Sequence, residues 1–406
     1  VVELLDVANM RAVIRDFGDK NPQEDPVIHF YELFLTEYDS KKRLQRGVFY
    51  TPRPIVSFIV RSVDKRLRTE FGLEDGLADT STWGEMIERI IGLKIPQSTP
   101  PEQSFVQILD PATGTGTFLV EVIEIIHKTM SEKWHKEGNT AKDINELWNN
   151  YVPEHLLPRL TGYELMMAPY SIAHMKIGLK LKETGYQFKS KDRVRVFLTN
   201  SLESAQDFSG TLTFAIPALA HEAETVNSIK RDHKFTVVIG NPPYSTISGN
   251  LSAEAISFVE PFRYVNGKRL IVKAALAHER NLQDDYVKYF GLLCRHLWNT
   301  GVGIGSYISN FGFLDSQSLA GMRCSILNSF DLVDILDLGG RVADHSSEAK
   351  GDENVFEISQ GVAISILAKR SSNIESTMLR YKRLRGSQKS KLSTLNQNDM
   401  RNLSLD

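Results

Sequence analysis

Cysteine is scarce in this chain of 406 residues, which has only Cys294 and Cys324. Two cysteines in unrelated contexts exclude a disulfide scaffold and a CxxC metal cluster, and they are typical of a reducing compartment. No apolar run approaches the ~20 residues that a membrane-spanning helix needs, and the start of the sequence lacks the layout of a signal peptide. We therefore expect a cytoplasmic protein with no membrane partner.

The chain also lacks an excess of charge of either sign. Lys and Arg number 48 and Asp and Glu number 50, so the formal net charge is -2. No global positive field marks a polyanionic partner, and any contact with nucleic acid must be local. The histidines are scattered without metal-ligand spacing, so we predict no metal site.

Two common nucleotide-binding motifs are missing. No GxxxxGK[ST] loop is present, which disfavours ATP binding in the P-loop manner. A glycine turn does occur at Gly114 and Gly116, but Leu119 occupies the third glycine position of the dinucleotide fingerprint. No acid ends a strand ~20 residues further on, so NAD is disfavoured as well.

Short apolar runs alternate with longer periodic segments after residue 104, a pattern typical of strands and crossover helices in a parallel sheet. It predicts an α/β fold with a doubly wound, mostly parallel, seven-stranded sheet. The expected strands are Phe105–Asp110, Arg159–Glu164, Val194–Leu198, Phe235–Ile239, Gly303–Ile308, Leu332–Leu338 and Ala363–Ala368. Residues 1–46 are expected to be helical, and Thr51 is expected to cap a helix that follows it.

The first motif runs from Ile108 to Phe118, where a strand ending in Asp110 passes through a glycine turn into a helix starting near Thr117. Without β-carbons at Gly114 and Gly116, a ligand can lie directly against the backbone at the helix start. A tight structural turn is the alternative for such a GxG alone.

Two further strand ends carry polar side chains. Glu164 ends the next predicted strand, where a carboxylate can accept protons from both ribose hydroxyls of a nucleoside. Asn200 and Ser201 follow the third strand, and Asn200 could hydrogen-bond an adenine edge. A solvated loop glutamate is the alternative interpretation of Glu164.

The most specific segment is Asn241-Pro242-Pro243-Tyr244 directly after an apolar strand. Two prolines fix the backbone and remove two N–H donors, so the carbonyls there are fixed acceptors. If the Asn241 side-chain oxygen and the Pro242 carbonyl each accept a hydrogen from an aromatic amine, the nitrogen lone pair is localised for attack. Tyr244 can stack on a purine, and a duplex base must be flipped out to reach it.

In order, DPATGTGTF, GYE and NPPY resemble the amino-methyltransferases, and FYTP ahead of them is similar to the adenine-N6 group that includes type I modification subunits. Flanking segments, among them HFYELFLTEYD, GNPPYS and QGVAISILAKR, resemble the methyltransferase region of type ISP restriction-modification enzymes. The similarity covers essentially the whole chain. It implies a Rossmann-like S-adenosylmethionine-dependent fold and a site-specific DNA methyltransferase that modifies N6 of a flipped-out adenine in a restriction-modification system.

The resemblance also implies roles for individual residues. Tyr50 and Thr51 would lie near the methionine end of S-adenosylmethionine, and Glu164 would hold its ribose. The other implied cofactor residues are Asp110, Ala112, Thr113, Gly114, Gly116, Thr117, Phe118, Asn200 and Ser201. Of these, Asn200 would lie beside the cofactor adenine, at a position where the family usually has Asp. The implied catalytic set is Asn241, Pro242, Pro243 and Tyr244. Phe356 would face the flipped base together with Tyr244.

The resemblance divides the chain into a helical adaptor (1–46), a catalytic domain (47–370) and a lead-in to an absent target-recognition domain (371–406). That last segment contains the basic residues Arg380, Lys382, Arg383 and Arg385. Neither a Walker motif nor a nuclease cluster of carboxylates and lysine is found. The expected partner is double-stranded DNA, with nuclease, helicase and target-recognition regions elsewhere in a larger polypeptide or in a partner subunit.

Two alternative functions are open on the sequence. The same NPPY turn serves methyltransferases that act on protein glutamine or RNA guanine, although those enzymes typically carry a different N-terminal module in place of FYTP and an adaptor helix. A catalytically silent DNA-binding subunit is the second alternative, and the intact Asn241 and Tyr244 argue against it.

Overall fold

The computed structural model describes residues 51–189, 193–204, 217–244, 248–270, 275–341, 351–370 and 376–403. The predicted adaptor, residues 1–46, lies outside the described residues, as does Tyr50. None of the described helices is long and apolar enough to cross a membrane.

An eight-stranded sheet forms the centre of the structure, in the order β10-β8-β9-β7-β4-β1-β2-β3. Its strands are β1 (Ile108–Asp110), β2 (Leu160–Glu164), β3 (Arg195–Leu198), β4 (Val237–Gly240), β7 (Gly303–Asn310), β8 (Leu332–Gly339), β9 (Val362–Lys369) and β10 (Met378–Arg383). Neighbouring strands are parallel except that β9 runs antiparallel to β7 and β8. The predicted α/β class and all seven predicted strands are confirmed.

The seven-strand count was wrong by one, because β10 pairs in parallel with β8 at the sheet edge. This strand alternates exposed and half-buried residues instead of forming an apolar run, and it carries part of the basic run. Residues 376–403 are therefore joined to the sheet and do not form a separate unit. A target-recognition domain beyond them stays a prediction.

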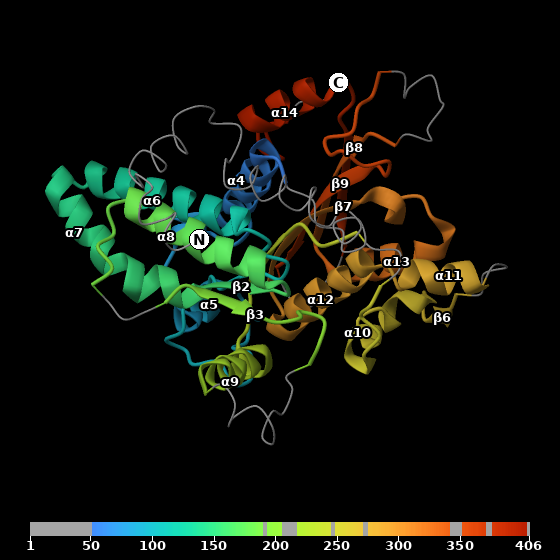
Figure 1. The fold of residues 1–406 in the computed structure, drawn as a ribbon, viewed down its shortest axis with the longest axis horizontal. Helices are drawn as coiled ribbons and strands as arrows, with labels where there is room; N and C mark the ends of the chain where they lie inside the picture. Colours follow the sequence, from blue (N-terminus) through green and yellow to red (C-terminus); the bar gives the residue numbers. More distant parts are fainter. Residues whose placement is uncertain are drawn as a thin grey trace, which may run out of the picture.

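Helices cover both faces of the sheet (Figure 1). On one face α4 (Arg53–Glu70) packs against α6 (Thr117–Lys136), and α6 packs against α8 (Met167–Glu183). On the other face α12 (Asp285–Thr300) packs on β7, with the rings of Phe290 and Tyr307 5.5 Å apart. The remaining helices are α5 (Trp83–Arg89), α7 (Ala141–Tyr151), α9 (Pro217–Asp232), α10 (Ala253–Ser257), α11 (Ala275–Leu282), α13 (Ala320–Ser329) and α14 (Gln388–Gln397), and a hairpin of β5 (Tyr264–Val265) and β6 (Lys268–Arg269) follows α10.

The start of α4 differs from its prediction. Pro52 is the residue that precedes the helix, and no side chain caps it. Thr51 was expected to be the cap, but its hydroxyl oxygen accepts a hydrogen bond from Asn241 Nδ2 at 2.9 Å. The expectation was wrong because Pro52 takes the cap position, with its carbonyl accepting the Ile55 N–H, and this leaves the Thr51 side chain to face the carboxyl edge of the sheet.

Strand order reverses between β1 and β4. The chain leaves β1 for β2 and β3 on one side, and then returns to place β4 on the other side of β1. In an open α/β sheet the crevice at such a reversal lies outside the carboxyl ends of the strands, and ligands bind there. Asp110, Glu164 and Asn241 all lie at this edge, as the end or the next residue of a strand.

Buried ion pairs hold β10 in the sheet. Asp334 of β8 is fully buried, and its carboxylate pairs with Arg66 of α4 at 2.5 Å and with Arg380 of β10 at 2.6 Å. Asp337 of β8 accepts from both Arg385 Nη atoms at 3.1 Å. Much of the basic run is thus neutralised inside the fold by the acidic residues of β8.

We predict that Asp334→Ala lowers the free energy of unfolding by about 3 kcal/mol, because it leaves the buried guanidinium of Arg66 without its nearest carboxylate. Denaturant unfolding measures this. A matched control is Glu146→Ala, which removes only an exposed pair with Lys142 at 4.0 Å and should cost at most about 0.5 kcal/mol. Equal losses of unfolding free energy in the two variants would show that the buried pairs at Asp334 stabilise the fold no more than an exposed pair does.

Candidate active site

The turn after β1 has the backbone shape that the sequence predicted. Gly114 and Gly116 adopt φ of +54° and +83°, and Gly116 is the residue before α6. A β-carbon on Gly116 would lie 3.2 Å from Ala173 Cα of α8, so the turn is pressed against that helix. The Thr113 N–H donates to the Tyr163 carbonyl at 3.0 Å, which ties the turn to β2.

Some of the other predicted residues of this turn are partly exposed at the site, and others are buried in the core. Thr117, at the start of α6, accepts a hydrogen bond from Lys176 Nζ at 3.2 Å. Phe118 is buried in the hydrophobic core. Ala112 is half-buried, and its N–H donates to Asp110 Oδ1 at 3.1 Å. The side chain of Phe118 therefore anchors the helix and only its backbone is near the turn.

Glu164 joins the ends of β1 and β2. Its Oε2 accepts the Gly114 N–H at 2.8 Å, and its Oε1 accepts the Met166 N–H at 2.7 Å. Burial raises the pKa of this carboxyl, while the N–H groups of Met166 and Gly114 lower it. The alternative interpretation, a solvated loop glutamate, is wrong, because the side chain is buried and holds the glycine turn.

Asp110 is fully buried at the end of β1. Burial raises the pKa of its carboxyl to about 8, although the hydrogen bond from Ala112 opposes the shift. Its second oxygen, Oδ2, has no hydrogen-bond partner within the described part of the chain. A β-carbon on Gly240 would lie 2.8 Å from Asp110 Oδ1, so the ends of β1 and β4 approach closely. Burial of this oxygen without a partner disfavours the charged form of the carboxyl, in agreement with its raised pKa.

The loop after β3 is fixed from two sides. The Thr199 N–H donates to the Glu164 carbonyl at 2.8 Å, and the Ser201 hydroxyl donates to the Pro111 carbonyl. Lys230 of α9 donates to the Asn200 carbonyl at 2.7 Å and to Thr199 Oγ1 at 2.9 Å. Burial lowers the pKa of the Lys230 ammonium to about 8. Lys230 was missed in the sequence, because a single lysine in a polar helix gives no signal.

The catalytic turn predicted from NPPY follows β4 at the same edge. Asn241 Nδ2 donates to Thr51, and Asn241 Oδ1 accepts the Tyr244 hydroxyl at 2.7 Å. Tyr244 is buried and its hydroxyl also lies 3.3 Å from the Ile308 carbonyl. Pro242 is buried, and no group of the described residues donates to its carbonyl. Pro243, between Pro242 and Tyr244, is half-buried.

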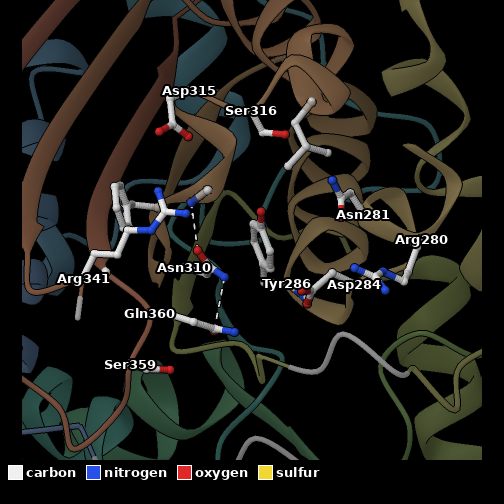
Figure 2. Close-up of a pocket in the computed structure, with 14 residues that line it drawn as sticks. Arg280, Asn281, Asp284, Tyr286, Asn310, Asp315, Ser316, Arg341, Ser359 and Gln360 are labelled. Carbon is white, nitrogen blue, oxygen red and sulfur yellow. Dashed lines mark hydrogen bonds between the residues drawn. The ribbon is translucent and has the colours of Figure 1, made fainter. Parts of the chain in front are cut away.

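A cavity of about 770 Å³ lies beyond the end of β7, the strand next to β4. Figure 2 shows Asn310 and Gln360 pointing toward one another at the cavity, joined by a hydrogen bond of 3.2 Å, with Tyr286 nearby. Phe311 lines the cavity as well, whereas Phe356 is buried outside its lining. Stacking of a base on Phe356 stays a prediction. Our prediction did not use Asn310 and Phe311, a polar residue that ends the apolar strand β7 and the aromatic residue that follows it.

Metal-binding side chains do not gather in this structure. Among the described residues, no group of three or more His, Cys, Asp or Glu side chains could hold a metal ion.

Comparison with known families gives two matches on separate stretches of the chain. Residues 159–342 match the Eco57I restriction-modification methylase family, and residues 22–71 match the N-6 DNA methylase family. Over these two stretches the chain is similar to N6-adenine DNA methylases of restriction-modification systems. The first stretch contains Glu164, Asn200 and Asn241, and the second contains Thr51.

Several solved structures share the fold of this chain. A DrdV–DNA complex is 23% identical with a TM-score of 0.66, and the match covers 93% of this chain and 32% of that one. The type ISP restriction-modification enzyme LlaBIII bound to DNA is 23% identical with a TM-score of 0.67, covering 91% and 23%. The type ISP enzyme LlaGI, as a nuclease-deletion mutant with a DNA substrate mimic, is 21% identical with a TM-score of 0.66, covering 93% and 27%.

The chain spans at most a third of the length of these three solved proteins. The predicted Rossmann-like methyltransferase fold is confirmed by them. A search of curated proteins finds no match to the chain.

The raised pKa of Asp110 predicts a pH dependence of stability. Because the folded protein holds this proton up to about pH 8 and the unfolded chain releases it near pH 4, stability falls as pH rises through this window. The Asp110→Asn variant has an amide at this position, which does not titrate, so this pH dependence is absent from it. Between pH 6 and pH 9, we expect wild type to lose on the order of 2 kcal/mol more stability than the variant.

Chemical unfolding of both proteins at the two pH values measures this difference, and all other titrating groups are shared. Identical pH profiles would show that Asp110 is ionised throughout.

Proposed function

We propose that this chain transfers a methyl group from S-adenosylmethionine to N6 of an adenine flipped out of double-stranded DNA, as the modification part of a restriction-modification system. The observation that carries the proposal is the position of Asn241 and Pro242. They stand at the strand-order reversal, next to the glycine turn of β1 and across from Glu164. Acceptors for an amine therefore adjoin a site suited to a nucleoside.

The described residues fit S-adenosylmethionine. Gly114 leaves open space against the backbone of the turn, because a β-carbon there would meet no atom closer than 4.0 Å. Asp110 would hold the turn in place by accepting the Ala112 N–H. Glu164 would hold the ribose hydroxyls, and Asn200 the adenine. Thr51, Ala112, Thr113, Thr117, Phe118 and Ser201 would complete the surroundings of the cofactor. When bound, S-adenosylmethionine supplies a methyl group activated by the sulfonium charge.

The chain's own residues then act on the target amine. The N6 amine of adenine is a weak nucleophile, because its lone pair is delocalised into the ring. Asn241 Oδ1 and the Pro242 carbonyl would each accept one N6 hydrogen, which localises the lone pair toward the methyl group. Since the methyl group is already activated, positioning and electrostatics contribute more than a strong base. After methyl transfer the N6 nitrogen is positively charged and carries two hydrogens. One of these would be lost as a proton to solvent by way of the same acceptors.

In the structure the Tyr244 hydroxyl occupies one lone pair of Asn241 Oδ1 and the Thr51 hydroxyl accepts from Asn241 Nδ2. These two contacts hold the amide at the end of β4, with Nδ2 toward Thr51 and Oδ1 toward Tyr244. One lone pair of Oδ1 stays available to the substrate. Tyr244 thereby gains a positioning role beside the predicted stacking on the base.

The first test incubates the chain with radiolabelled S-adenosylmethionine and unmethylated DNA, followed by digestion and identification of the labelled nucleoside. Wild type should yield N6-methyladenine, and Asn241→Ala should lower the rate at least about 100-fold, because one acceptor at the reacting nitrogen is lost. Cofactor binding by Asn241→Ala, measured by calorimetry, should stay near that of wild type. Labelling of a different nucleoside, or an undiminished rate in the variant, would contradict the proposal.

A second prediction separates the two roles of Tyr244. Tyr244→Phe keeps the ring and loses the hydroxyl that orients Asn241, so kcat should fall about tenfold with KM for DNA nearly unchanged. Tyr244→Ala loses the ring as well, so KM for DNA should also rise. Steady-state kinetics on unmethylated DNA measures both constants. A Tyr244→Phe enzyme with normal kcat would show that the hydroxyl does not position Asn241.

Double-stranded DNA is the proposed partner. Nuclease, helicase and target-recognition regions are proposed to lie elsewhere in a longer polypeptide or in a partner subunit. The solved relatives support this proposal, since two are type ISP restriction-modification enzymes and all three are bound to DNA or a DNA mimic.

A further inference from the structure

A chain of hydrogen-bonded side chains joins the end of β3 to the first turn of α12. Asn200 Nδ2 donates to Asn250 Oδ1 at 2.8 Å, and Asn250 Nδ2 donates to Asp285 Oδ1 at 3.0 Å. The Ser248 hydroxyl donates to the same carboxylate oxygen. Segment 248–250 comes a few residues after the predicted catalytic turn. This series of hydrogen bonds therefore links the loop that follows Asn241 to the loop that contains Asn200.

Asp285, at the buried end of this series of hydrogen bonds, determines which side chain donates and which accepts at each step. Asp285 is buried and, as a carboxylate, can only accept hydrogen bonds. Asn250 must therefore turn its Nδ2 toward Asp285, which leaves its Oδ1 facing Asn200. Lys288, which is fully buried, donates to the Asn250 carbonyl at 2.6 Å and to Ser248 Oγ at 2.8 Å. The main chain of the segment is thereby held in place as well.

The Asn200 amide is fixed by the same logic. Its Nδ2 donates to Asn250 and also to Glu203 Oε1 at 3.1 Å, while its Oδ1 accepts the Leu202 N–H at 3.1 Å. Rotation of the amide by 180° would set oxygen against two acceptors and nitrogen against a donor. Both N–H groups of Asn200 are thus committed, and one lone pair of Oδ1 is left within the described residues. A ligand that reaches this half-buried side chain meets only an acceptor.

We propose that Asp285, Asn250 and Glu203 fix the Asn200 amide as an obligate acceptor for the 6-amino group of the cofactor's purine. The inference rests on the proposed function, because it takes S-adenosylmethionine as the cofactor with its adenine at Asn200. A 6-amino purine donates to Asn200 Oδ1, whereas a 6-oxo purine would place an acceptor there. Sites with fixed polar groups reject ligands that leave those groups unpaired. Asn250 and Asp285 are therefore positioning residues that determine cofactor specificity.

The test measures binding, without DNA, of S-adenosylhomocysteine and of its 6-oxo analogue S-inosylhomocysteine by calorimetry. Wild type should prefer the 6-amino ligand at least tenfold. Asn250→Ala frees one N–H of Asn200, which can then meet an oxygen, so the preference should fall about fivefold. The matched control, Asn328→Ala, removes an exposed asparagine of α13 and should leave the preference unchanged.

A second variant separates specificity from folding. Aspartate at position 200 has no N–H to misdirect, so the Asn200→Asp/Asn250→Ala double variant should again prefer the 6-amino ligand at least tenfold. Equal weakening of both ligands by Asn250→Ala, or equal binding of both ligands by wild type, would overturn the proposal and leave the proposed function intact. Failure of folded wild type to bind either ligand would contradict the proposed function, and this proposal with it.

Discussion

The ends of β1 and β4 approach each other so closely that no side chain fits between them. A β-carbon on Gly240 would come within 2.8 Å of Asp110 Oδ1, and only glycine leaves space for the fully buried carboxyl. This contact fixes the spacing between the glycine turn after β1 and the catalytic turn after β4. Because both turns follow directly from these two strands, the positions of the proposed cofactor site and of Asn241 depend on this contact.

Buried polar groups do most of the further positioning around this contact. Glu164 ties the glycine turn to β2, Lys230 ties the loop after β3 to α9, and Asp285 directs the amide chain that ends at Asn200. Such groups are costly to bury unless they are paired, and when paired they specify one arrangement. The near-neutral net charge of the chain is consistent with this local pairing of opposite charges.

Much of the fold was predictable, because apolar strand runs and glycine turns are local signals. The seven predicted strands and the helix at Thr117 were found where the sequence placed them. β10 was missed because its stability comes from ion pairs with Asp334 and Asp337, residues over 40 positions away. Thr51 was wrongly expected to cap α4, because its real partner, Asn241, is 190 positions distant.

The site shows the same division. Motif order identified the residues at the strand ends, but not the side chains that orient them. Lys230, Asn250 and Lys288 act through contacts formed only after folding, and nothing in the sequence around them marks these contacts. Phe356 was chosen for its place before a late strand; it is buried outside the lining of the cavity beyond β7, which includes the aromatic residues Tyr286 and Phe311. Tertiary contacts decide such cases.

The most direct measurement is a crystal structure of the chain with S-adenosylhomocysteine. The account predicts the cofactor product across the ends of β1, β2 and β3, with its ribose on Glu164, its adenine amine on Asn200 Oδ1 and its sulfur facing Asn241. A ligand bound elsewhere, or one at this edge with its sulfur directed away from Asn241, would contradict the account.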